Sequence, residues 1–158
     1  MPLWKSWIAI AGTALVAGGV AWLSKLAVIV ATDGRVTHTG AAATFLDIGL
    51  VLLMVGSTGV GLRLASNQEA SMRVILAVLS PLVFGVLFTA FSAIGYVILA
   101  LRGVIAGVAV PGYLLEEGGI FVSAVVGLGV GVWLVTGAVW RGSARGASGS
   151  GEAGPRVR

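Results

Sequence analysis

The chain alternates long apolar blocks with short polar segments, and the lengths of the blocks predict its architecture. Four apolar blocks run over residues 7–31, 42–64, 74–101 and 114–140. A helix needs about 20 apolar residues to cross the hydrocarbon core of a bilayer, and each block is long enough. The sequence therefore predicts an all-α integral membrane protein built as an antiparallel bundle of four transmembrane helices.

The segments between the blocks predict how consecutive helices are connected. Residues 32–40 and 65–73 are short and polar, whereas residues 102–112 are more apolar and rich in glycine, which predicts a loop at the membrane surface. Short links favour side-by-side packing of consecutive helices. Residues 142–158 are rich in Gly, Ser and Arg, so we expect a disordered tail after a transmembrane domain that spans residues 1–141.

Composition supports a bilayer as the main solvent of this chain. Hydrophobic residues make up 58% of the sequence and charged residues only 10%, against about 25% charged residues in a soluble domain. The formal charge is +4, but four of the ten basic residues lie beyond the last apolar block. Basic residues that flank membrane spans are topology signals, so we expect no nucleic-acid partner.

The distribution of basic residues predicts the orientation of the bundle. Four spans place both termini on one side of the membrane. The basic residues expected on that side outnumber those on the other, which favours both termini in the cytoplasm of a cell-membrane protein. The first group is Lys5, Arg63, Arg73, Arg141, Arg145, Arg156 and Arg158, and the second is Arg35 and Arg102.

Most site chemistry is excluded by residue types. The chain has no cysteine, which excludes disulfides, thiol catalysis and Cys-ligated metals. His38 is the only histidine; it cannot form a zinc or haem site alone, although it could sense pH. Residues 56–63 have the glycine spacing of a phosphate-binding loop, but Leu62 replaces its lysine. We therefore expect no metal, no cofactor and no enzymatic activity.

Two ionisable residues, Lys25 and Asp47, lie well inside apolar blocks. Because the first helix runs outward and the second returns, both residues are expected about 8–9 Å below the outer ends of their helices. Opposite charges at matching depth predict an intramembrane ion pair between them. Two alternatives stay open: independent interfacial residues, with Lys25 extending its long side chain to the interface, or part of a transport or ligand site.

The remaining charges gather at the outer end of the predicted bundle. Glu116 and Glu117 are expected in the first turn of the fourth helix, where they complement the helix dipole. Consecutive helical residues point about 100° apart, so one glutamate can face solvent while the other faces the bundle. The candidate outer charged cluster comprises Arg35, His38, Arg102, Glu116 and Glu117.

The functional expectation is a small multi-pass membrane protein that acts as a non-enzymatic accessory or partner-binding subunit. Small residues at four-residue spacing, such as Ser123, Gly127 and Gly131, suit close helix packing within one chain or in a homo-oligomer. The alternative is a small transporter or channel with an outward-facing charged vestibule. The inner halves of the spans offer only hydroxyl groups, which counts against a proton path through the bilayer.

Overall fold

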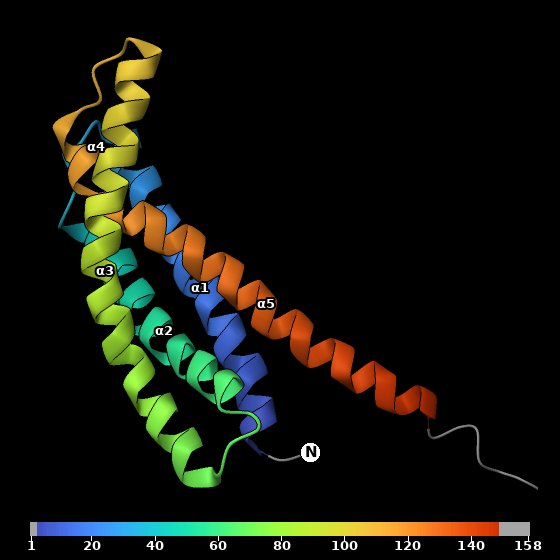
Figure 1. The fold of residues 1–158 in the computed structure, drawn as a ribbon. Coiled ribbons are helices and arrows are strands. Elements are labelled where there is room, and N and C mark those ends of the chain that lie inside the picture. The colour runs from blue at the N-terminus through green and yellow to red at the C-terminus, as the bar shows by residue number, and fades with distance from the viewer. Residues whose placement is uncertain (1–2, 149–158) are drawn as a thin grey trace, which may run out of the picture.

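The computed structural model describes residues 3–148 of the chain, and the side chains of residues 3–137. It is all-helical in this range, with α1 at Leu3–Ala31, α2 at Gly40–Leu64, α3 at Ala70–Ala106, α4 at Gly112–Glu116 and α5 at Gly118–Ser148 (Figure 1). Four of these helices, α1, α2, α3 and α5, are long and apolar enough to cross a membrane. The predicted four-helix membrane bundle is thereby confirmed.

Two boundaries differ from those expected from the sequence. Helix α3 continues to Ala106 and ends at Gly107, which has a left-handed φ of 63°, so much of the predicted 102–112 loop is helical. The predicted fourth span is interrupted at Glu117, which separates the short α4 from α5. Helix α5 extends into the segment predicted as a disordered tail, and the rest of that tail, residues 149–158, lies outside the described residues.

The helices pack in a ring in which each long helix has two neighbours. Helix α1 packs against α2 and α5, and α3 packs against the same two helices, so α1 and α3 face each other across the bundle. The expected pairing of consecutive helices is confirmed for α1 with α2 and for α2 with α3. Figure 1 shows that the distance between α3 and α5 grows with distance from α4.

We call the end of the bundle with residues 32–39 and α4 the loop end, and the opposite end, where α1 begins, the terminal end. At the loop end the backbones of α3 and α5 are in direct contact, because a Cβ atom on Gly95 would collide with the backbone of Gly118. Between α1 and α5, a Cβ atom on Gly131 would lie 2.7 Å from the Gly12 carbonyl oxygen. Small residues therefore set the close helix contacts within this single chain.

Helix α3 contributes least to the interior. None of the residues in its most apolar 18-residue window is buried. Its exposed side chains are large and apolar, including Val78, Val83 and Val86, which are 63%, 54% and 74% exposed. Such a surface is stable in hydrocarbon, so most of α3 faces lipid.

Candidate functional site

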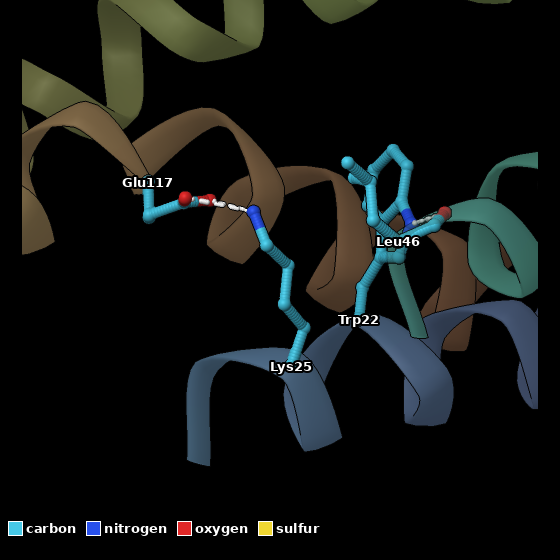
Figure 2. A network of polar contacts seen from close by, with 4 residues as sticks. All are labelled: Trp22, Lys25, Leu46 and Glu117. Carbon is cyan, nitrogen blue, oxygen red and sulfur yellow. Dashed lines mark hydrogen bonds and ion pairs between the residues drawn. The ribbon is translucent and has the colours of Figure 1, made fainter. Parts of the chain in front are cut away.

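A buried ion pair joins α1 to the turn that precedes α5. The ammonium nitrogen of Lys25 donates hydrogen bonds of 2.7 Å to both carboxylate oxygens of Glu117 (Figure 2). Lys25 is 0% exposed and Glu117 is 6% exposed. Both charges are thus removed from water and lipid, and each neutralises the other. An isolated charge at this depth would cost several kcal/mol, so the pairing is a condition for burying either residue.

The local backbone explains why Glu117 can reach Lys25. Glu117 lies between α4 and α5 with φ −87° and ψ 4°, and its carbonyl oxygen accepts a hydrogen bond from the Phe121 amide. Glu117 therefore directly precedes the first turn of α5, where the helix dipole favours a negative charge. The next residue, Gly118, is the one in backbone contact with Gly95 of α3. The position of the carboxylate is thereby fixed by helix packing.

Trp22 forms the aromatic side of the site, one helical turn before Lys25. Its indole N–H donates a 3.0 Å hydrogen bond to the Leu46 carbonyl oxygen of α2 (Figure 2). The ring also reaches across the bundle to α3, with its centroid 5.4 Å from that of Phe88. The five-membered ring of the indole lies over Gly49, where a Cβ atom would collide with it. Trp22 therefore ties α1 to both α2 and α3.

The predicted partner of Lys25 was wrong. No salt bridge joins Lys25 to Asp47, because Glu117 occupies that role and Asp47 is exposed on the outside of α2. The reason is helix rotation: Gly49 faces Trp22, and a residue two positions earlier on a helix points about 200° away. The direction of the Asp47 side chain therefore differs from the expected one.

The other residues of the predicted outer charged cluster are separated by burial. Glu117 is buried, whereas Arg35, His38, Arg102 and Glu116 are exposed. Within the described residues, none of these four exposed side chains forms an ion pair or hydrogen bond. The expectation that one glutamate faces the bundle and the other faces outward is confirmed.

Helix α4 covers the loop end next to the ion pair. The Tyr113 hydroxyl donates a 3.1 Å hydrogen bond to Asp33, and the Tyr113 ring packs on Gly34. Gly34 has a φ of 74° and Asp33 a φ of 50°, so this turn combines a left-handed backbone with close ring contact. Desolvation raises the pKa of Tyr113, and the hydrogen bond to Asp33 and the charge of Asp33 raise it further.

Sequence reasoning missed the pairing of Lys25 with Glu117, although two local signals pointed to it. Two glycines follow Glu117 directly, and glycine pairs interrupt helices and allow close backbone approach. Trp22 lies one turn from Lys25, and a large aromatic side chain there favours a face of the first span that points into the bundle.

A second polar group of the interior is the hydroxyl of Ser123. It is buried and has no hydrogen-bond partner in the described part of the chain.

Comparisons of the chain with protein-family models, with curated proteins and with solved structures find no match. The fold and the site by themselves define the class of protein. The chain is a multi-pass membrane protein with four candidate spans and a buried Lys25–Glu117 salt bridge at the loop end.

Proposed function

We propose that the protein is a non-enzymatic accessory subunit that binds another integral membrane protein through the outward face of α2. The observation that carries this proposal is the exposure of Asp47 within a membrane span. Among the described residues, Asp47 has no ion-pair or hydrogen-bond partner. Charged residues inside membrane spans almost always face a bundle interior and pair with another group.

The depth of Asp47 makes its lack of a partner costly. It lies seven residues after the first residue of α2, Gly40, which corresponds to about 10 Å along the helix. An aspartate at the centre of a span costs about 3 kcal/mol on insertion scales, and a side chain this short reaches the interface less easily than a lysine does. A neighbouring cation in the same layer of the membrane would remove much of that cost.

The surroundings of Asp47 define the chemistry of the proposed partner. Ile48 and Val51 on the same face are 45% and 59% exposed, so this face of α2 is apolar around a single carboxylate. The partner would be a transmembrane helix with an apolar face and a lysine or arginine at the depth of Asp47. A second copy of this chain suits this role poorly, because its embedded Lys25 is already buried against Glu117.

We also propose that the protein lies in the cell membrane with both termini in the cytoplasm. The support is the excess of basic residues at the terminal end, where Lys5, Arg63 and Arg73 flank the spans. The loop end carries Arg35 and Arg102 together with the exposed Glu116. In this orientation Asp47 lies in the outer half of the bilayer.

Site-specific photocrosslinking in native membranes tests the proposal. A benzophenone amino acid at Val51, one turn from Asp47, should give a discrete adduct with a second membrane protein. The same probe at Val86 of α3, which is 74% exposed, is the matched lipid-facing control and should give none. Replacing Asp47→Asn should abolish the Val51 adduct, because the neutral side chain no longer attracts the cation of the partner.

Two results would contradict the proposal. The first is an equal yield of adducts from Val51 and Val86, which would make the α2 face ordinary lipid-exposed surface. The second is ion flux in liposomes of the purified protein that is lost in the double variant Lys25→Met/Glu117→Gln, which would favour the alternative of a small transporter or channel. The flux assay uses full-length protein, with Asp47→Asn as the control variant that keeps the ion pair intact.

A further inference from the structure

A second feature, separate from the Asp47 face, is a lateral groove between α3 and α5. Its volume is about 340 Å³. The two helices diverge toward the terminal end (Figure 1). Helix α3 lines the groove with Ser80, Val83 and Phe84, and α5 lines it with Val126 and Val130. Leu15 of α1 and Ser57 of α2 also line it.

The walls of the groove offer no free polar group to an occupant. The two hydroxyl groups among its lining residues are bonded within their own helices: Ser57 donates to the Met54 carbonyl and Ser80 to the Leu76 carbonyl, both at 2.7 Å. All other lining side chains are apolar or absent. The part of an occupant that lies in the groove must therefore be hydrocarbon, because a buried polar group would find no partner.

The groove is open to the bilayer. Val83 and Leu79 on one wall are 54% and 44% exposed, and Val126 on the other is 39% exposed, so an occupant can enter from the lipid. A lipid acyl chain is pure hydrocarbon and needs no polar partner in the walls, so it suits this lining.

Basic side chains lie at the terminal end of the groove. Arg63 directly precedes Leu64, a lining residue, and its guanidinium lies 5.3 Å from the Trp133 ring of α5. Arg73 lies one turn before the lining residue Leu76, and its guanidinium lies 5.1 Å from the Trp4 ring of α1. Both arginines belong to terminal turns of their helices, at the depth of lipid headgroups. Arginine pairs well with phosphate because its planar fork can donate two parallel hydrogen bonds.

We propose that the groove is a binding site for one phospholipid with an anionic headgroup. One acyl chain lies between α3 and α5, and the phosphate is held at the terminal end by Arg73. The charge of the site favours an anion, since Lys5 lies at the same end and the exposed Glu69 is the one acidic residue there among those the structure describes. This lipid would fill the space that the divergence of α3 and α5 leaves, and would stabilise their separation.

The proposal is tested with full-length protein in phosphatidylcholine vesicles that contain a small fraction of phosphatidylglycerol with a diazirine in its acyl chain. After illumination, the label should concentrate on residues 79–91 of α3 and 126–130 of α5. Phosphatidylcholine with the same diazirine serves as the headgroup control. It should label these segments about tenfold less, because the positive charge of its choline group cancels the net negative charge of the headgroup and is repelled by the basic side chains.

Two substitutions separate the groove from the general lipid surface. Val83→Trp fills the groove and should lower labelling of residues 126–130 several-fold, while Val78→Trp, on the opposite face of α3, should leave it unchanged. Arg73→Gln should reduce the preference for phosphatidylglycerol without abolishing labelling. Helical circular dichroism and a single gel-filtration peak confirm folding of each variant. Equal labelling by the two lipids, or undiminished labelling in both Val83→Trp and a second groove variant, Val126→Trp, would overturn the proposal.

Discussion

The ammonium of Lys25 donates hydrogen bonds to both carboxylate oxygens of Glu117 in the interior of the bundle, although the two residues are 92 positions apart in the sequence. Lys25 lies on α1, and Glu117 lies where α4 ends and α5 begins. The pair therefore fixes the first span against the last one. It also fixes the depth at which α5 starts, because Glu117 cannot move along the bundle axis without leaving Lys25 unpaired. The contact specifies the arrangement of the helices as well as neutralising two charges.

Removal of one partner of this pair should be strongly destabilising. Glu117→Gln leaves a buried ammonium and Lys25→Met leaves a buried carboxylate, and each should lower the free energy of unfolding by about 3–5 kcal/mol. The double substitution should cost much less than the sum of the two, because no uncompensated charge remains. Unfolding of the purified protein in detergent, followed by circular dichroism against increasing denaturant, measures all three effects.

Asp47→Asn is the matched control for this cycle, since it neutralises a carboxylate at similar depth that has no partner within the described residues. It should change stability in detergent by less than about 1 kcal/mol, as expected of an exposed side chain. Strictly additive effects of Lys25→Met and Glu117→Gln would show that the two side chains do not interact.

The sequence sufficed for the spans but not for the side-chain directions within them. Block lengths predicted four helices because the bilayer demands a minimum apolar length whatever the packing. The rotation of α2 did not follow, because it depends on where the Trp22 ring packs. That ring lies over Gly49, and its N–H donates a hydrogen bond to the Leu46 carbonyl oxygen. Once this contact exists, Asp47 points outward.

The break at Glu117 was also missed, although the glycine pair that follows it is a sequence signal for an interrupted helix. The contact of Gly118 with Gly95 shows why the chain turns there. The length of α3 was underestimated for a related reason. Residues 102–106 have no strong helix-stopping residue other than Gly103, and the left-handed turn at Gly107 sets the true end of the helix.

Gly49 and Gly129 should respond differently to the same substitution. In Gly49→Ala the new methyl group would collide with the Trp22 ring, and we expect a loss of about 1–3 kcal/mol from overpacking. In Gly129→Ala the methyl group meets nothing within 4 Å, so the higher helix propensity of alanine should add up to about 1 kcal/mol. Denaturant unfolding of both variants in one detergent provides the comparison. A larger loss for Gly129→Ala than for Gly49→Ala would be inconsistent with the observed packing.

The contact of Tyr113 with Asp33 predicts a pH effect at the loop end. The pKa of Tyr113 is raised above its ordinary value of 10.0, first by desolvation and then by Asp33, so folding favours the protonated phenol. The stabilising contribution is therefore complete below the unfolded pKa and is lost as pH rises through the folded one. In a Tyr96→Phe background, absorbance of the phenolate should give a titration midpoint for Tyr113 above 10.0.

Asp33→Asn should move this midpoint of Tyr113 downward, because it removes the negative charge beside the phenol. It should not remove the whole elevation, since desolvation is the larger cause. The control is Asp47→Asn in the same background, which should leave the midpoint unchanged. An upward movement in Asp33→Asn would contradict the hydrogen-bond geometry at the loop end.

Ser123 should be a site where removal of a polar group stabilises the protein. Its side chain is 0% exposed, and its hydroxyl has no hydrogen-bond partner in the part of the chain that the structure describes. A buried, unpaired hydroxyl costs about 1–3 kcal/mol, so Ser123→Ala should raise the free energy of unfolding by part of that amount. Ser57→Ala is the control, because Ser57 is also buried but donates a 2.7 Å hydrogen bond to Met54. The Ser57→Ala substitution should be neutral or destabilising. If Ser123→Ala instead loses as much stability as Ser57→Ala, the Ser123 hydroxyl must have a bonding partner in the folded protein, such as a bound water.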